Sequence, residues 1–170
     1  MKKKRIELIK GDITVLEVDA IVNAANKSLL GGGGVDGAIH DAAGPDLLTE
    51  CERLKGCETG QSKITQGYKL KVKHVIHTVG PVWHGGYRDE TSLLASCYQT
   101  SLELAKEKKL KTLAFPGIST GAYGFPKDLA ALIAVNETRR FLNKYSYPEK
   151  VIFVTFGDDS YEIYRKLLDQ

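Results

Sequence analysis

Two amides and a carboxylate flank a run of glycines near the N-terminus, and their types and spacing suggest a site for a sugar. Asn23 and Asn26 precede Gly31–Gly34, the first glycine loop, and Asp36 follows it. An amide donates and accepts hydrogen bonds, whereas an ionised carboxylate only accepts them. If the loop folds back, Asn26 and Asp36 can together hold sugar hydroxyls. The carboxylate can also take a proton from a water molecule.

Each of these side chains also has a purely structural interpretation. Asp36 could be an acid in the first turn of a helix, where it interacts favourably with the helix dipole. Asn23 could simply end its strand with a hydrogen bond to the backbone. His40 follows Asp36 by four residues, which places both on one helix face, and it could be structural or functional.

A second glycine loop, GISTGAYG (117–124), follows another apolar segment. Loops of this kind present backbone N–H groups to anions, and open α/β sheets bind ligands beyond the carboxyl ends of their strands. Taken alone, the second glycine loop could be only a mobile surface turn. Two such loops on one sheet predict a ligand whose phosphates are held from both sides.

Two common nucleotide-binding motifs do not fit. Gly32, Gly34 and Gly37 satisfy the dinucleotide pattern G-x-G-x-x-G, but the loop begins several residues after its strand, and residues 45–56 read as a helix. That pattern needs a tight turn directly after the strand and an acid ending the next strand about 20 residues on. Neither loop contains Gly-Lys-Ser/Thr, which a P-loop requires. Hydride transfer and phosphoryl transfer therefore lose support.

Two further residues at expected strand ends suit a nucleotide base. Asp12, at the end of the first strand, could accept a hydrogen bond from an exocyclic amine. Phe156 ends the last strand, where its ring could pack on the base. The structural alternatives are that Asp12 only caps a turn and that Phe156 is an ordinary core residue.

The elements that position these residues alternate between strand and helix. We expect strands at 6–14 (ending at Gly11-Asp12), 18–25, 62–70, 73–81, 111–119 and 150–159, and helices at 35–44, 45–56, 90–110, 126–145 and 159–170. This alternation predicts a layered α/β fold. The Val- and Ile-rich strands predict a sheet that is covered on both faces.

Length and charge bound the remaining possibilities. The 170 residues predict one domain, 1–170, with a short basic tail at 1–5. The net charge of +3 comes mostly from Lys2–Arg5, a run that is usually only solvated but could contact RNA. No apolar run approaches the roughly 20 residues of a membrane span, and no signal region follows the N-terminus, so we expect a cytoplasmic protein with no membrane partner.

The cysteines and histidines do not indicate a metal. Cys51, Cys57 and Cys97 lack the spacing of a zinc site or a disulfide framework, and we expect free thiols in a reducing compartment. The four histidines, His40, His74, His77 and His84, do not complete a metal-binding pattern with them. We therefore expect no metal and no cofactor.

Five ordered motifs resemble the macrodomain family, specifically its MacroD-like class. They are GDIT, IVNAAN, LLGGGGVDGAIHDAAGP, HTVGPVW and FPGISTGAYGFP, and the resemblance extends from Ile6 to about Leu168. It implies a single macrodomain in which a mixed central β-sheet lies between two layers of helices. It also implies binding of ADP-ribose and hydrolysis of ester-linked ADP-ribose. The implied substrates are proteins mono-ADP-ribosylated on Asp or Glu, and O-acetyl-ADP-ribose.

The resemblance also implies roles for individual residues. Asn26 and Asp36 match the catalytic positions, and Asn26 also matches a contact to the distal ribose. The implied ligand-binding residues are Asp12 and Ile13 at the adenine, Asn26, Gly33, Gly34, Val35 and Asp36 along the first glycine loop, Ser119, Thr120, Gly121, Ala122 and Tyr123 at the diphosphate, and Phe156 against the adenine.

Two other functions remain open at this stage. Some macrodomains only bind ADP-ribose, and a fold alone does not exclude such a reader module. The Asn26 and Asp36 pair favours the hydrolase, because non-hydrolytic relatives often lack it. An RNA-associated regulator rests only on Lys2–Arg5 and the net charge.

Overall fold

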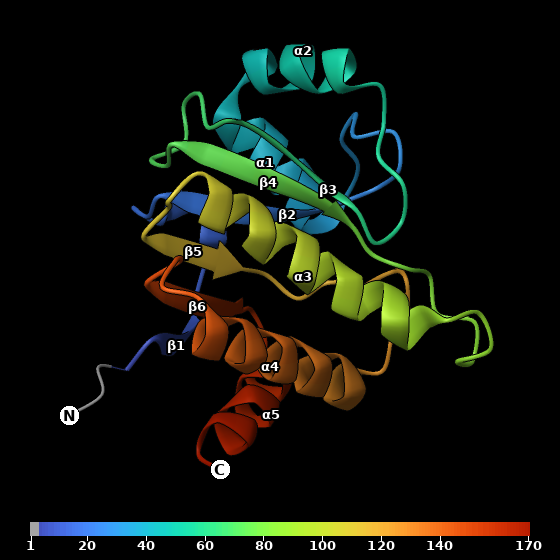
Figure 1. Ribbon diagram of the computed structural model, residues 1–170. Helices are drawn as coiled ribbons and strands as arrows, with labels where there is room; N and C mark the ends of the chain where they lie inside the picture. The colour runs from blue at the N-terminus through green and yellow to red at the C-terminus, as the bar shows by residue number, and fades with distance from the viewer. Residues whose placement is uncertain (1–3) are drawn as a thin grey trace.

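The computed structural model describes residues 4–170, which form one six-stranded sheet in the order β1-β6-β5-β2-β4-β3 (Figure 1). The strands are β1 (Ile6–Lys10), β2 (Ala20–Ala25), β3 (Ser62–Gln66), β4 (His74–Val79), β5 (Thr112–Phe115) and β6 (Lys150–Thr155). The helices are η1 (Ile13–Val15), α1 (Gly34–Ala43), α2 (Pro45–Leu54), α3 (Glu90–Glu107), α4 (Lys127–Lys144) and α5 (Asp158–Leu168). Only β3 runs antiparallel to its neighbour, so the sheet is mixed.

All the strands and helices expected from the sequence are present, but several strands end earlier. The first strand ends at Lys10, because Asp12 caps the short helix η1 instead of continuing the strand. The strand expected at 111–119 ends at Phe115, because Pro116 has no N–H for the sheet. The last strand ends at Thr155, two residues before Gly157 caps α5.

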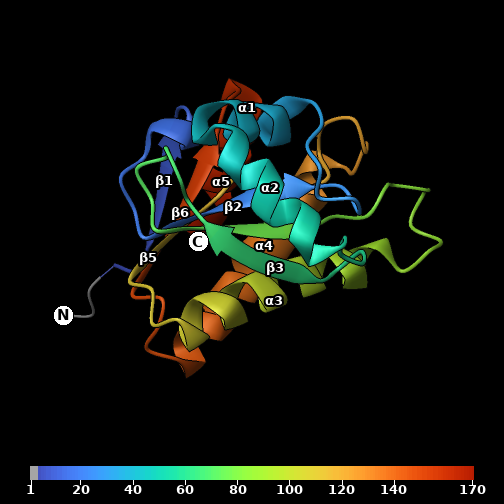
Figure 2. The same ribbon diagram turned by 90° about the horizontal axis from the view of Figure 1, so that it is seen from above.

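The helices cover both faces of the sheet, which confirms the layered α/β prediction. Figures 1 and 2 both show α1 and α2 together on one side and α3 and α4 on the other. Side chains of β2 alternate between these layers: Ala20 and Val22 pack with α3 and α4, whereas Ile21 packs with α1 and α2. Asn23 has the parity of Ile21, so its side chain faces the layer of α1 and α2.

The carboxyl ends of the parallel strands β2, β5 and β6 meet at one edge of the sheet. The first glycine loop follows β2 and leads into α1, and the second glycine loop follows β5 and leads toward α4. The two loops therefore face the same region, as the sequence predicts.

Arg5 belongs to the fold and is not a free charge of the N-terminal tail. Its guanidinium donates to the backbone carbonyls of Leu142, Tyr145, Ser146, Pro148 and Glu149, at 2.5 to 3.2 Å. These carbonyls lie at and just beyond the end of α4, where the helix dipole favours a cation. Lys2 and Lys3 lie outside the described residues. Because Arg5 is bound within the fold, only the lysines of the basic run remain for the RNA contact considered from the sequence. Across residues 4–170, none of the helices combines the length and the apolar character that crossing a bilayer requires.

Candidate functional site

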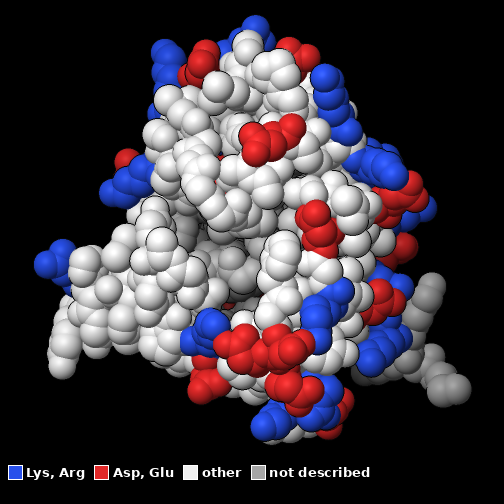
Figure 3. All heavy atoms as spheres, turned by 180° about the vertical axis from the view of Figure 1, so that it is seen from behind, with Lys and Arg blue, Asp and Glu red and all other residues white. Residues whose placement is uncertain are grey.

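A pocket of about 610 Å³ opens at the edge of the sheet where β2, β5 and β6 end. Its walls come from both glycine loops, from Gly11 and Ile13 after β1, and from the first turns of α4 and α5. Asp36, Lys127 and Asp159 are the charged residues in this lining. Figure 3 shows a hollow walled mostly by uncharged residues, with acidic and basic side chains at its lower rim.

Asn26 and Asp36 both lie beside Gly32 in the pocket wall, so the loop brings them to one pocket as the sequence predicts. A Cβ added at Gly32 would lie 3.3 Å from Asp36 Oδ2 and 3.4 Å from Asn26 Nδ2. The Asn26 side chain also shapes the loop, because its Nδ2 donates to the carbonyl of Gly31 at 2.9 Å and its Oδ1 accepts from the N–H of Leu29 at 3.2 Å. An amide nitrogen carries two hydrogens, so one N–H of Asn26 remains for a ligand.

At three positions in and after the first glycine loop, the structure shows why the residue is glycine. Gly31 and Gly34 have φ angles of 91° and 58°, in a backbone region that residues other than glycine rarely adopt. Gly37, in the first turn of α1, lies so close to the loop that a Cβ would be 2.5 Å from the carbonyl oxygen of Gly32. These glycines let the backbone fold tightly around the Asn26 and Asp36 pair.

Asp36 lies at the start of α1 and is 4% exposed, so it is both a first-turn helix acid and part of the pocket wall. Its Oδ1 accepts a hydrogen bond from Asn23 Nδ2 at 2.8 Å, and His40 Nε2 lies 3.5 Å from the same oxygen. Asn23 is within β2 and fully buried. The alternative that Asn23 merely ends its strand is therefore wrong, and the sequence analysis did not foresee its contact with Asp36.

The second glycine loop is folded back on itself. The N–H of Phe125 donates to the carbonyl of Ser119 at 2.9 Å, and the N–H of Trp83 donates to the carbonyl of Tyr123 at 2.8 Å. Ser119 has a φ of 66° and is 8% exposed, and its hydroxyl makes no hydrogen bond within residues 4–170. The backbone of Gly121 borders open space, because a Cβ there would meet no other atom within 4 Å. The residues of this loop that line the pocket are Ser119, Thr120, Gly121, Ala122 and Tyr123.

The loop also depends on a glycine that the sequence analysis missed. A Cβ at Gly80, just after β4, would lie 2.2 Å from the Ser119 hydroxyl oxygen. Gly80 therefore allows the second glycine loop to approach β4. Its position in HTVGP directly after a strand was a signal that could have identified it.

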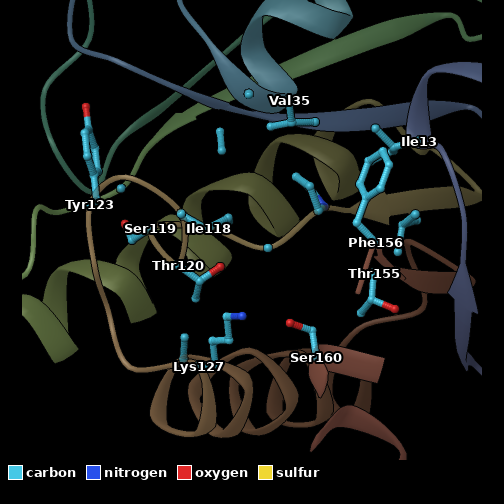
Figure 4. Close-up of a pocket in the computed structure, with 18 of the residues that line it drawn as sticks. Ile13, Val35, Ile118, Ser119, Thr120, Tyr123, Lys127, Thr155, Phe156 and Ser160 are labelled. Carbon is cyan, nitrogen blue, oxygen red and sulfur yellow. The ribbon is translucent and has the colours of Figure 1, made fainter. Parts of the chain in front are cut away.

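The end of the pocket that lies opposite Tyr123 in Figure 4 is apolar. Phe156 follows β6 and is 78% exposed, so the alternative that it is a core residue is wrong. Ile13 is 2% exposed and lines the pocket, and Figure 4 shows Ile13 and Phe156 on the same side of the cavity. Val35 closes the cavity from the side of α1. This end offers an aromatic face to a flat ring.

Asp12 caps η1, which confirms the capping role that the structural alternative gives it. Its Oδ1 accepts hydrogen bonds from Thr14 Oγ1 at 2.6 Å and from the N–H of Thr14 at 2.9 Å. These two bonds lower the pKa of Asp12 and keep its carboxylate ionised. Its neighbours Gly11 and Ile13 line the pocket, and Asp12 is exposed beside them. Contact with an amine at the pocket edge remains a prediction.

Two polar residues that the sequence analysis missed face the second glycine loop. Figure 4 shows Lys127, from α4, and Ser160, from α5, on the side of the cavity opposite Val35. The ammonium of Lys127 pairs with the carboxylate of Asp159 at 2.6 Å. A lysine in the first turn of a helix that directly follows a glycine loop, as in FPKD, was the available signal for Lys127.

Within residues 4–170, no three His, Cys, Asp or Glu side chains gather as metal ligands would. Cys51, Cys57 and Cys97 are buried free thiols. His77 is fully buried behind the pocket, and burial, with His40 nearby, lowers its pKa to about 3. It is therefore neutral in this fold at ordinary pH.

Comparison with known sequences identifies relatives along the whole chain. The Macro domain profile matches residues 22–134. A Macro domain-containing protein of Methanosarcina mazei is 60% identical over 166 residues, which are 98% of this chain and 89% of that protein. The ADP-ribose glycohydrolase MACROD2 of Homo sapiens is 53% identical over 171 residues, which are 98% of this chain and 40% of that longer protein.

Solved structures share the same architecture. A mutant of the Oceanobacillus iheyensis macrodomain, solved with ADPR, superposes with a TM-score of 0.92 at 45% identity and covers 96% of this chain and 91% of its own. The Trypanosoma brucei macrodomain in complex with ADP-ribose gives a TM-score of 0.91 at 45% identity, with coverage of 96% and 69%. The three-layer arrangement and the resemblance found in the sequence are both confirmed. This chain belongs to the Macro domain family.

Proposed function

We propose that this protein binds ADP-ribose and hydrolyses ADP-ribose that is attached through an ester. The observation that carries the proposal is that Asp36 Oδ2 and Asn26 Nδ2 both lie beside Gly32, within a pocket that has glycine loops along its middle and an aromatic residue at its far end. The relatives support it, because MACROD2 is named an ADP-ribose glycohydrolase and two similar macrodomains were solved with ADP-ribose or ADPR.

We place the proposed ligand along the pocket from one end to the other. The adenine lies against Phe156 and Ile13, with its amine donating to Asp12. The diphosphate lies between the first glycine loop, at Gly33, Gly34 and Val35, and the second, at Ser119, Thr120, Gly121, Ala122 and Tyr123. The distal ribose then reaches Asn26 and Asp36. The unpaired hydroxyl of Ser119 and the open backbone of Gly121 support the diphosphate assignment.

The proposed reaction adds water across the ester bond. Asp36 Oδ2 orients the water or takes its proton, the water oxygen bonds to the acyl carbon, and the bond from that carbon to the ribose oxygen breaks. The ribose oxygen takes up the proton, so the products are a free carboxyl group and a ribose hydroxyl. No Ser-His-Asp or Cys-His set appears among the pocket-lining residues, so we expect no covalent enzyme intermediate. Fixing the ribose geometry supplies much of the acceleration.

The substrates we propose are proteins mono-ADP-ribosylated on Asp or Glu and O-acetyl-ADP-ribose, both of which carry such an ester. Titration calorimetry with ADP-ribose tests binding, and release of ADP-ribose from an ester-linked peptide tests turnover. We expect both. Binding without release would support a reader module instead, and no binding at millimolar ADP-ribose would contradict the whole proposal.

A further inference from the structure

A row of buried polar side chains lies behind Asp36, on the face of the sheet that α1 and α2 cover. It runs from Asn23 on β2 to His77 on β4 and Thr65 on β3, and each of these residues is at most 2% exposed. Asn23 and His77 are direct cross-strand neighbours in the parallel pairing of β2 with β4. None of the three lines the pocket, so they act on a ligand only through another residue.

The hydrogen bonds along this row allow one consistent assignment of donors and acceptors. Asp36 Oδ1 can only accept, so Asn23 must present its Nδ2, at 2.8 Å. The same Nδ2 lies 3.2 Å from His77 Nδ1, and an amide nitrogen only donates, so Nδ1 must accept. The proton of neutral His77 therefore sits on Nε2, which lies 2.9 Å from Thr65 Oγ1. The Thr65 hydroxyl in turn donates to the carbonyl of Gln66 at 3.0 Å.

The Asn23 amide has no other anchor at this point. Its Oδ1 is buried and makes no hydrogen bond within residues 4–170. The two acceptors of Nδ2, Asp36 Oδ1 and His77 Nδ1, therefore fix the rotation of the amide. The groups that face this cluster from α1 and α2 are His40, 3.5 Å from Asp36 Oδ1, and the Cys51 thiol, 3.9 Å from His77 Nε2.

We propose that His77 is a positioning residue that aims the Asp36 carboxylate into the pocket through the Asn23 amide. This inference rests on the proposed function, in which Asp36 acts on the ester. With Asn23 locked, Asp36 Oδ1 stays bound inside the protein and Oδ2 stays directed at Gly32 and the distal ribose. Without an acceptor at His77 Nδ1, the amide turns more freely and the carboxylate loses its fixed aim.

The test compares two variants of nearly equal size. His77→Asn shortens the side chain but keeps a carbonyl oxygen near the former Nδ1, whereas His77→Leu removes the acceptor. We expect His77→Leu to lower the single-turnover rate on an ester-linked peptide about 10-fold or more, as losing one oriented hydrogen bond would. We expect His77→Asn to recover most of this loss, and the Kd for ADP-ribose to change less than about threefold in both. Thermal unfolding checks that both variants fold.

His74→Leu serves as the matched control. His74 is on the same strand as His77, but its Nδ1 faces the backbone carbonyl of Thr65 and points away from Asp36. We therefore expect the His74→Leu variant to keep the wild-type rate. Equal rates for wild type and His77→Leu would overturn the positioning role while leaving the proposed function intact. A wild-type protein that binds ADP-ribose but releases none would overturn both.

A second measurement is independent of turnover and of variant folding. Nitrogen-15 NMR of the wild-type imidazoles distinguishes the two neutral tautomers. We expect His77 to carry its proton on Nε2 throughout pH 5–8. A proton on Nδ1 would contradict the hydrogen-bond direction on which the inference depends.

Discussion

The two oxygens of the Asp36 carboxylate lie in different environments. Its Oδ1 is held inside the protein by Asn23, while its Oδ2 reaches the pocket wall at Gly32. Asn26 does the same with its amide, because one bond to Gly31 anchors a group that also lines the pocket. Each residue is fixed before any substrate arrives. Such preorganisation makes a polar contact effective in a transition state.

The preorganised amide of Asn26 predicts the effect of Asn26→Ala. Loss of one preorganised polar contact costs about 10²–10³ in rate, and we expect this fall in single-turnover release of ADP-ribose. The affinity for ADP-ribose should change less, because the second glycine loop and Phe156 hold the other half of the ligand. The double variant with Asp36→Ala should be little slower than the slower single variant, since residues that act as a unit are not additive. Fully additive losses would show that the two side chains act separately.

Gly121 gives a prediction about the diphosphate. Its backbone faces open space and has no positive φ, so side chains fit there without disturbing the free protein. We expect Gly121→Glu to abolish ADP-ribose binding through bulk and charge, while Gly121→Ala weakens it only modestly. Calorimetry of both folded variants checks this. Undiminished affinity in Gly121→Glu would place the phosphates elsewhere.

At the scale of the elements, Glu90 organises the segment between β4 and α3. The residue is 1% exposed, and its carboxylate accepts from the backbone N–H groups of His84, Gly86 and Arg88 at 2.5 to 2.9 Å. The same segment contacts the second glycine loop through the N–H of Trp83. Burial would raise the pKa of Glu90, but the backbone bonds outweigh this and lower it to about 2.

This lowered pKa predicts a pH-dependent contribution to stability. The contribution is fully present above the ordinary glutamate value of 4.5 and is lost as pH falls through that value toward about 2. We expect Glu90→Gln to lower the free energy of unfolding near neutral pH, with the difference from wild type shrinking in acid. Urea unfolding of both proteins from pH 7 to pH 3 measures it. A difference that does not depend on pH would mean that the charge of Glu90 is unimportant.

In the whole molecule, two layers of helices hold the two glycine loops and the short turn between β6 and α5 at one sheet edge. Because the pocket is lined by residues at the ends of β2, β5 and β6, binding of a ligand there should tie distant parts of the chain together. At a 100-fold excess over its Kd, ADP-ribose should stabilise the fold by about 2.7 kcal/mol. Chemical denaturation with and without ADP-ribose measures this shift, with adenine alone as a weaker control. No shift at saturating ADP-ribose would contradict specific binding to the native state.

Much of this architecture could be predicted from the sequence. Strand and helix order follows from apolar periodicity, and glycine loops after β2 and β5 imply a common ligand site. The cross-strand contact of Asn23 with His77 could not be predicted, because it depends on the pairing of strands 54 residues apart. Lys127 and Ser160 face the pocket only because α4 and α5 begin at the same sheet edge. The predicted strands were also too long at their ends, where local caps such as Asp12 bind the backbone.

In the proposed reaction, the Asp36 carboxylate acts on an ester at the distal ribose. The most direct test of this role is the single-turnover release of ADP-ribose from an ester-linked peptide by wild type and by Asp36→Ala, at enzyme concentrations that saturate the substrate. We expect the Asp36→Ala rate to fall by at least as much as the rate of Asn26→Ala, about 10²–10³, because a ribose contact and the group that assists the water are both removed. Release at the wild-type rate would show that Asp36 is only a helix-start acid and would contradict the catalytic assignment.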